Sequence, residues 1–252
     1  MYFTRFPINL TRREARRLVS SPYRMHAAVA GSFPPPEREG DGRILWRIDE
    51  LPGGGAYLYI VSPGRPSLIG MNEQIGFPDL EPSWQTRDYG PFLEQLAIGQ
   101  RYAFRLVANP TVSRSTRGGN TRVADGLGNS KRISHLTILQ QEAWLIGKDA
   151  YTGRSADVPE LFANQTAPRS VRCGFVVLQD EHGAPRLVVS NSHKRTFAKG
   201  AQKRPITLSV AQFDGLLEVS DVAALRHALV SGIGHGKGFG CGLMTLAILE
   251  RE

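Results

Sequence analysis

Two residues near the start of the chain, Tyr23 and His26, have the side chains and the spacing for proton-transfer chemistry. Residues three apart on a helix share a face, so the phenol and the imidazole are expected to lie side by side. An imidazole, with an ordinary pKa of about 6.5, exchanges protons at neutral pH, and a tyrosine hydroxyl can hydrogen-bond a reacting oxygen. Taken alone, a histidine at such a position is more often structural. The pair is therefore a candidate acid–base site that depends on a partner elsewhere in the chain.

A second candidate is the segment 232–242, in which six glycines alternate with other residues. Repeated glycines permit positive φ and predict a loop that exposes backbone N–H groups to a ligand. The order of residues fits neither a Walker loop nor a dinucleotide fingerprint, because a strand follows the segment. The alternative is a flexible glycine linker. The residues of the segment that we predict to bind a ligand are Gly232, Gly234, His235, Lys237 and Gly240.

The charge of the chain predicts a polyanionic partner. Thirty-one Lys and Arg residues against 23 Asp and Glu give a net charge of +8, with a pI near 9.8. Basic residues gather in the segments 5–24, 101–132 and 186–204, which contain Glu14, Asp125 and no acid, respectively. Three nearly acid-free clusters favour binding of nucleic acid over three merely solvated faces. Candidate contacts are Arg12, Arg13, Arg16, Arg24, Lys194, Arg195, Lys199 and Lys203.

Other functional classes are disfavoured by composition and motifs. The two cysteines, Cys173 and Cys241, exclude a disulfide framework and suggest a reducing compartment. No pair of histidines has a metal-ligand spacing, so no metal or other cofactor is expected. No apolar run approaches the length of a membrane span, and the start of the chain lacks a signal-peptide core. These features predict a basic cytoplasmic protein without a membrane partner.

The elements that must position these residues follow a repeated order. The first half predicts a strand at 2–9, a helix to 19 opened by a Thr11–Glu14 capping box, and a helix capped by Ser21-Pro22 and closed at Gly31. Strands at 43–49 and 56–61 form a hairpin, the stretch 62–91 has no clear assignment, and a short helix covers 91–96. A domain boundary follows at Ile98-Gly99.

The second half repeats this pattern more clearly. Strands are predicted at 101–108, 173–179, 186–192, 205–210, 216–219 and 243–249, with helices at 136–144 and 222–230 and a mobile basic loop at 113–130. We therefore predict an α+β chain of two tandem ferredoxin-like (βαββαβ) domains, spanning 1–97 and 98–252. A single larger α+β domain is the alternative.

Several segments together resemble the CasE family, the CRISPR repeat endoribonucleases of type I-E Cascade complexes. The glycine-rich segment is similar to the signature of repeat-associated RNA-processing proteins. Further similar segments are Tyr2-Phe3-Thr4, Ala15-Arg16-Arg17, the stretch 21–26, Ile44-Leu45-Trp46-Arg47, the stretch 104–110, and Lys131-Arg132 before the Trp144 helix. The resemblance spans nearly the whole chain in the right order.

The resemblance implies a metal-independent cut at the 3′ base of the hairpin in each CRISPR repeat. The RNA's own 2′-hydroxyl would attack and leave a 2′,3′-cyclic phosphate, with His26 as general acid or base and Tyr23 orienting the 2′-hydroxyl. The segment 192–199 would enter the major groove of the RNA stem. The partners implied are the repeat RNA and the other Cascade subunits, and the free protein would be a monomer.

The sequence departs from the family at one point and leaves alternatives open. Some members carry a lysine shortly after the histidine, whereas Ala30-Gly31-Ser32 contains none. Lys237, Arg24 or a basic loop residue could supply the cation at the phosphate instead. A non-catalytic protein that binds RNA hairpins is the main alternative function, and a general DNA-binding protein is a third.

Overall fold

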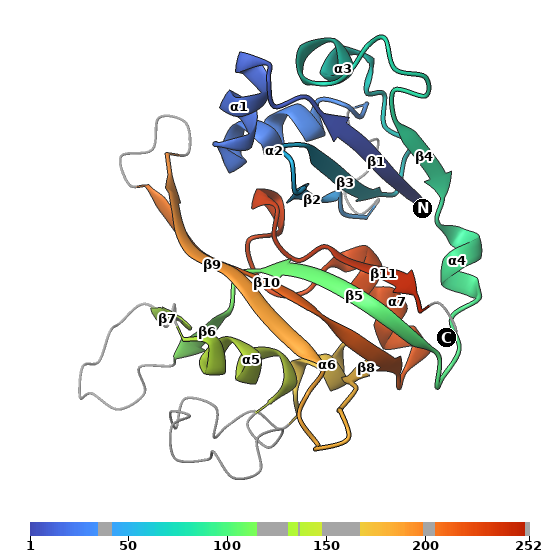
Figure 1. The fold of residues 1–252 in the computed structure, drawn as a ribbon, viewed down its shortest axis with the longest axis vertical. Helices are drawn as coiled ribbons and strands as arrows, with labels where there is room; N and C mark the ends of the chain where they lie inside the picture. Colours follow the sequence, from blue (N-terminus) through green and yellow to red (C-terminus); the bar gives the residue numbers. More distant parts are fainter. Residues whose placement is uncertain (35–41, 115–130, 136, 148–166, 199–204, 250–252) are drawn as a thin grey trace, which may run out of the picture.

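The first half of the chain forms a four-stranded antiparallel sheet with its first three helices on one face (Figure 1). The computed structural model describes residues 1–34, 42–114, 131–135, 137–147, 167–198 and 205–249. The order of elements is β1 (Tyr2–Ile8), α1 (Arg13–Val19), α2 (Pro22–Ala30), β2 (Leu45–Glu50), β3 (Ala56–Ser62), α3 (Ile69–Ile75), β4 (Gln85–Asp88) and α4 (Gly90–Glu94). The strands lie side by side as β2-β3-β1-β4, which is the ferredoxin-like arrangement.

The second half repeats that arrangement with longer strands. Its elements are β5 (Arg101–Ala108), β6 (Thr111–Arg114), β7 (Lys131–Ser134), α5 (Ile138–Ile146), α6 (Arg169–Arg172), β8 (Phe175–Val177), β9 (Leu187–Phe197), β10 (Ile206–Val219), α7 (Val222–Ser231), the 3₁₀ helix η3 (Lys237–Phe239) and β11 (Met244–Ile248). The sheet order is β11-β5-β10-β8, and β9 continues the position of β8 along β10. The prediction of tandem ferredoxin-like domains is confirmed, and the alternative of one larger domain is not needed.

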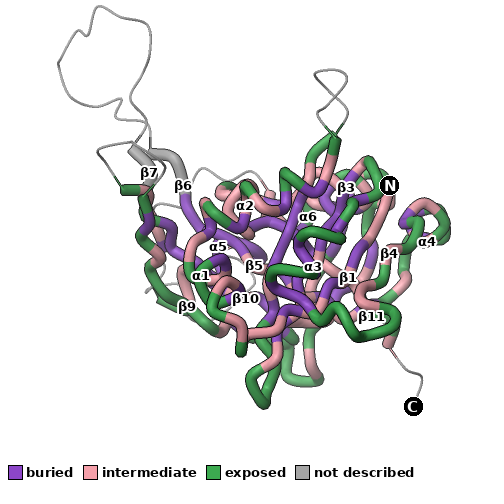
Figure 2. The backbone as a smooth tube through the Cα atoms, turned by 90° about the horizontal axis from the view of Figure 1, so that it is seen from above, coloured by how far each residue is buried: buried purple, intermediate pink, exposed green. Residues whose placement is uncertain are grey.

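The boundary between the domains stays a prediction. Residues 97 and 98 lie in the connection between α4 and β5. A hydrophobic core crosses this division, since Leu45 and Val61 of the first sheet belong to the same buried cluster as Leu106 and Leu243. Figure 2 shows buried residues along the strands and exposed residues on the outer helices and connections.

Two predicted features of the chain are wrong. Thr11 does not cap α1, because its hydroxyl donates to Asn9 Oδ1 at 2.5 Å and the N-cap is Arg12, which makes no side-chain cap bond. The predicted strands at 205–210 and 216–219 are parts of one strand, β10, because the residues between them pair with both β5 and β9. Gly215 lies within this strand, where a Cβ would come within 2.6 Å of the carbonyl oxygen of Arg186.

One segment that the sequence left unassigned contains a helix and a strand. Another predicted segment lies largely outside the described residues. Within 62–91 the chain forms α3 and β4, and β4 pairs with β1 as an edge strand. Residues 115–130 of the predicted basic loop lie outside the described residues, while β6 and β7 flank them. In the described part of the chain, no helix is both long and apolar enough to cross a membrane.

Candidate functional site

The helix α2 holds Tyr23 and His26 on a short, well-anchored element. Ser21 accepts a hydrogen bond from the backbone N–H of Arg24 at 3.4 Å, and Pro22 occupies the first helical position, so the predicted cap is confirmed. Pro22, Met25 and Val29 are the buried face of the helix. Tyr23 and His26 are half-buried, whereas Arg24 is exposed. The buried face of α2 therefore anchors the helix, while Tyr23 and His26 on its other side remain partly accessible.

The glycine-rich loop, residues 232–242, is a fixed structure and not a flexible linker. Gly232, Gly234, Gly236, Gly240 and Gly242 have φ between +75° and +92°. At Gly240 (φ +82°) a Cβ would lie 2.8 Å from the indole of Trp46, and at Gly234 (φ +79°) it would lie 3.0 Å from that of Trp144. The first tryptophan belongs to the first domain and the second to the other domain. Only glycine lets the loop pass between these two side chains.

Much of the loop's backbone is already hydrogen-bonded within the protein. The N–H of Ile233 donates to Gly242 O at 2.9 Å, that of Phe239 to Gly236 O at 2.8 Å, and that of Gly242 to Val107 O at 2.6 Å. Ile233 and Cys241 point into the core. Burial raises the pKa of the Cys241 thiol to about 12, so it stays protonated and is not a nucleophile. The expectation that the loop exposes its N–H groups to a ligand therefore does not hold for these three.

Helix α2 and the glycine-rich loop meet at His26. A Cβ placed on Gly238 would lie 3.7–3.9 Å from Cε1, Nε2 and Nδ1 of the His26 ring, so this glycine faces the imidazole at close range. The ring of Phe239 lies edge-on to that of His26, with centroids 6.3 Å apart. Tyr23 packs beside Phe239 in a small cluster with Phe197 and Cys241. The structure thus brings together the two motifs that the sequence singled out separately.

A buried ion-pair network holds the two domains together next to this loop. Arg47, which is 2% exposed, donates to both carboxylate oxygens of Asp49 at 2.6 and 2.8 Å. It also donates to the carbonyl oxygens of Arg105 at 2.9 Å and of Leu243 at 3.1 Å. Leu243 directly follows the loop, so a residue of the first domain fixes the loop's end. Sequence reasoning noted Arg47 only through the family resemblance; charged residues two apart in an apolar strand were the available signal.

The predicted basic residues do not all gather at His26. Arg12 donates to Glu73 O, and Arg16 donates to the carbonyls of Leu10 at 2.9 Å and Thr11 at 2.7 Å, so both brace the start of α1. Arg195 crosses from β9 to donate to Val19 O, and burial lowers its pKa. Arg13 and Lys194 are exposed on the surface. Lys199 and Lys203 lie outside the described residues.

The two remaining candidates in the loop have structural contacts. Lys237 donates from Nζ to Ser231 O at 2.6 Å, and burial lowers the pKa of its ammonium group. His235 forms an isolated β-bridge with Asn109, whose side chain accepts from the N–H of Ser209 at 3.1 Å. Both residues therefore tie the loop to the second domain. Among the residues that the structure describes, no group of three or more side chains could hold a metal ion.

Comparison with known proteins finds a matching family, two relatives and a solved structure with the same fold. A family model described as CRISPR associated protein matches residues 1–247. The chain is 26% identical, over 98% of its length and 100% of the relative's, to the CRISPR-associated endoribonuclease Cse3 of Thermus thermophilus. It is 29% identical over 157 residues, 62% of each protein, to the CRISPR system Cascade subunit CasE of Escherichia coli. A structure of the endoribonuclease Cse3 bound to 19 nt RNA has the same fold, with a TM-score of 0.71 at 24% identity, covering 98% of this chain and 100% of that one.

Proposed function

The chain belongs to the CRISPR associated protein family, and on that premise we propose that it is an endoribonuclease of CRISPR repeat RNA. It cuts the precursor within each repeat, at the 3′ base of the repeat hairpin. The names of its relatives support this activity, since one is a CRISPR-associated endoribonuclease and another is a subunit of Cascade. The observation that carries the proposal is the packing of His26 against Gly238, which sets an acid–base side chain beside a loop anchored in both domains.

The proposed reaction is a transesterification within the RNA. The 2′-oxygen of the nucleotide before the cut bonds to the adjacent phosphorus, and the bond from phosphorus to the 5′-oxygen of the next nucleotide breaks. The products are a 2′,3′-cyclic phosphate and a free 5′-hydroxyl. His26 moves a proton as the base at the 2′-oxygen or the acid at the 5′-oxygen, and the Tyr23 hydroxyl orients the 2′-hydroxyl. The reaction proceeds without a metal ion because the nucleophile belongs to the substrate and is held in line.

A cation near the scissile phosphate would stabilise the charge that develops there. Lys237 and Arg24 are the two candidates among the described residues. Lys237 is adjacent to Gly238 in the loop, but its ammonium group already donates to Ser231 O. Arg24 lies on α2 between the two acid–base residues and is exposed. Cleavage rates of Lys237→Ala and Arg24→Ala would separate the two.

In this proposal the protein stays bound to the repeat RNA after cutting it. The β9–β10 hairpin, which extends from the second sheet towards α1 and α2, would contact the stem of the repeat RNA through its basic residues (Figure 1). The bound protein then serves as a Cascade subunit in the cytoplasm, and the free protein is a monomer. RNA hairpins are recognised through shape, phosphates and 2′-hydroxyls, which suits an arginine-rich surface.

The test is cleavage of the repeat RNA by His26→Ala in the presence of EDTA. We expect the wild type to give one discrete product, and the variant to cleave about 10²–10⁴-fold more slowly while its affinity for the hairpin changes little. His227→Ala, which removes an exposed histidine from α7, is the matched control and should cleave like the wild type.

Three results would overturn the proposal. Full activity of His26→Ala would remove the assigned acid–base residue, and a strict requirement for magnesium would contradict the reaction. Tight hairpin binding by a wild type that gives no product would instead favour a non-catalytic RNA-binding protein. Equal competition by duplex DNA would favour a general DNA-binding protein.

A further inference from the structure

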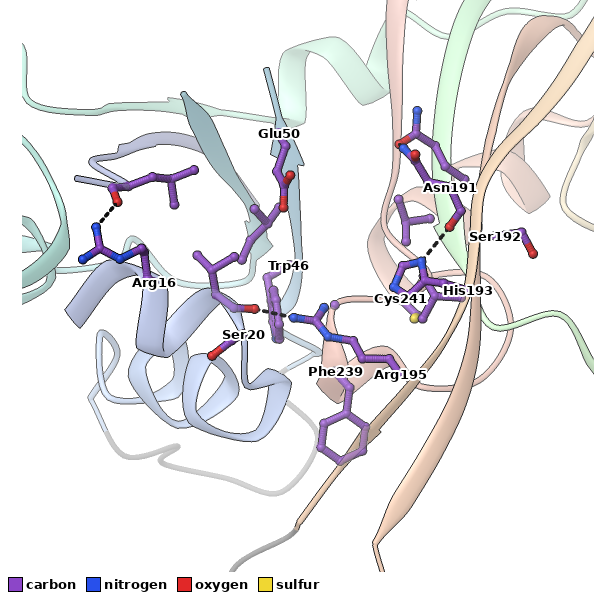
Figure 3. A pocket seen from close by; sticks show the side chains of 17 residues that line it. Arg16, Ser20, Trp46, Glu50, Asn191, Ser192, His193, Arg195, Phe239 and Cys241 are labelled. Atoms are coloured by element: carbon purple, nitrogen blue, oxygen red, sulfur yellow. Dashed lines mark hydrogen bonds between the residues drawn. The ribbon is translucent and has the colours of Figure 1, made fainter. Parts of the chain in front are cut away.

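A hollow lies between the two domains, next to the proposed catalytic site. It has a volume of about 810 Å³ and is lined by α1, β2, β5, β9, β10 and the glycine-rich loop. Figure 3 shows side chains of both domains facing it, including Arg16 and Trp46 from the first and His193 and Arg195 from the second. We call it the interdomain cleft. Neither Tyr23 nor His26 lines the cleft, so it is distinct from the acid–base pair.

The cleft is continuous with the proposed catalytic site through shared walls. Phe239 lines the cleft and also lies edge-on to His26. Ser20 lines it from the turn that precedes α2. Phe239 therefore contacts both His26 and the cleft.

A β-bulge turns the side chains of β9 into this cleft. His193 pairs with Val210 and Ser190 with Gln212, so Asn191 and Ser192 both lie opposite Ala211. Asn191 has a left-handed backbone, with φ +49°, which asparagine tolerates better than most residues. Before the bulge, the odd-numbered Leu187 and Val189 point into the core; after it, the odd-numbered His193 and Arg195 line the cleft. The extra residue thus reverses the alternation and aims two polar side chains at the cleft.

A hydrogen bond to a nearby carbonyl favours one tautomer of the His193 ring. Its Nδ1 lies 2.8 Å from the carbonyl oxygen of Asn191, which can only accept, so Nδ1 carries the proton. In the neutral ring Nε2 is then an acceptor, and His193 is exposed. An acceptor at this place matches a donor hydroxyl, and the 2′-hydroxyl is the donor that RNA has and DNA lacks.

The other lining residues suit a nucleotide. Arg16 and Arg195 contribute guanidinium groups, and Glu50 is the one acid among the lining residues. Val19, Ile48 and Phe239, which are all half-buried, supply an apolar surface for a base. A volume of this size encloses a drug-sized molecule, so one or two unstacked nucleotides fit, whereas a duplex does not.

We infer that the interdomain cleft binds the single-stranded RNA that adjoins the base of the repeat hairpin, with His193 reading a ribose 2′-hydroxyl. This inference rests on the proposed function, because it takes the repeat RNA as the substrate. The single strand at the base of the hairpin passes Phe239 and places its phosphate at Arg16 or Arg195. The cleft thereby adds affinity that a bare hairpin does not have.

The experiment measures binding, not cleavage, with RNAs that cannot be cut because the nucleotide before the scissile phosphate lacks its 2′-hydroxyl. Three RNAs are compared by fluorescence anisotropy: the hairpin alone, the hairpin with a 5′ single strand, and the hairpin with a 3′ single strand. We expect one flank to tighten binding by the wild type, which identifies the strand in the cleft. His193→Ala should weaken binding of that RNA about five- to tenfold, as for one lost hydrogen bond, and leave binding of the bare hairpin unchanged.

Two further arms make the result specific. Replacing the flank by deoxyribonucleotides should weaken binding by the wild type to the same extent and have no further effect on His193→Ala. His182→Ala, which removes an exposed histidine from the turn before β9, should bind all RNAs like the wild type. The inference is overturned if neither flank adds affinity, or if His193→Ala weakens the bare hairpin as much as the flanked one. Failure of the proposed function would show instead as the absence of cleavage of ordinary repeat RNA, whatever the flank does.

Discussion

The two domains share one strand order but use the helix after their first strand differently. In the first domain that position is taken by α1 and α2, and α2 buries three of its nine residues and leaves Tyr23 and His26 partly accessible. In the second domain it is taken by α5, which buries five of its nine residues, including Trp144. The same topology thus gives a helix that presents side chains in one domain and a helix that fills the core in the other.

The connection before the last strand also differs: it lies at an outer edge in the first domain and packs between the domains in the second. In the first domain, residues 76–84 join α3 to β4 at the outer edge of the sheet. In the second, the glycine-rich loop joins α7 to β11 and packs between Trp46 and Trp144. Neither domain alone holds the candidate site, because the helix comes from one and the loop from the other. The site therefore depends on how firmly the domains are joined.

The largest expected effect tests that junction. Arg47→Ala leaves Asp49, which is 7% exposed, without its main partner and removes the bonds to Arg105 O and Leu243 O. Losing one member of a buried pair costs about 3–5 kcal/mol. Urea unfolding should show that loss, with the two domains no longer unfolding together, and cleavage should fall with it. Arg101→Ala breaks an exposed pair with Glu218 and should cost under about 1 kcal/mol, so equal losses would contradict the role of Arg47.

The next effect concerns the pH dependence contributed by a buried histidine of the second domain, His135. Burial, together with the nearby charge of Arg169, lowers the pKa of His135 to about 4. Between pH 6.5 and 4 the unfolded chain binds a proton there that the folded chain does not. Stability is therefore complete above about pH 6.5 and falls by about 3 kcal/mol as the pH drops towards 4.

Urea unfolding between pH 7 and 4 checks this. His135→Asn cannot titrate and should lose that part of the pH dependence, while His182→Ala, which changes an exposed histidine, should keep it. An unchanged slope in His135→Asn would show that other groups cause the acid sensitivity.

A smaller effect compares two glycines that both have a positive φ. Gly240 in the glycine-rich loop and Gly53 in the β2–β3 turn have φ of +82° and +92°, but only at Gly240 would a Cβ meet another group, Trp46, at 2.8 Å. Gly53→Ala should cost about 1 kcal/mol from backbone strain alone. Gly240→Ala adds overpacking and should cost about 2–3 kcal/mol and slow cleavage, because the loop shifts from His26. Similar losses in both, with cleavage unaffected, would show that the fit against Trp46 is unimportant.

The sequence predicted the fold well where local patterns decide it. Alternating strands such as Arg101–Ala108, the Ser21-Pro22 cap and the end of α2 at Gly31 are set by neighbouring residues. The edge strand β4 was missed, because its side chains are mostly exposed and pairing with β1 is what makes it a strand. The middle of β10 was also missed, because its pairing with both β5 and β9 is what makes it continuous.

The candidate site was predictable in its parts but not in its assembly. Tyr23, His26 and the glycine-rich loop each carry a local pattern, whereas the contact of His26 with Gly238 joins segments of different domains. The Arg47 network and the bulge that redirects His193 depend on pairing partners far away in the sequence. Asp49 near Arg47 is a local sign of a buried pair, but neighbouring residues specify neither the bonds from Arg47 to the second domain nor the bulge.

The smallest expected effect concerns two helix starts with the same local pattern, one in each domain. Thr11–Glu14 and Thr137–Gln140 both have the spacing of a capping box, but only Thr137 accepts from the backbone N–H of its N3 residue, at 3.3 Å, with Gln140 reciprocating. Thr137→Ala should therefore destabilise the protein by about 1 kcal/mol in urea unfolding. Thr11→Ala should cost only a few tenths, because its hydroxyl bonds to Asn9 in an exposed turn. Equal losses at the two positions would mean that Thr11 caps α1 in solution, since only a working cap explains a full loss there.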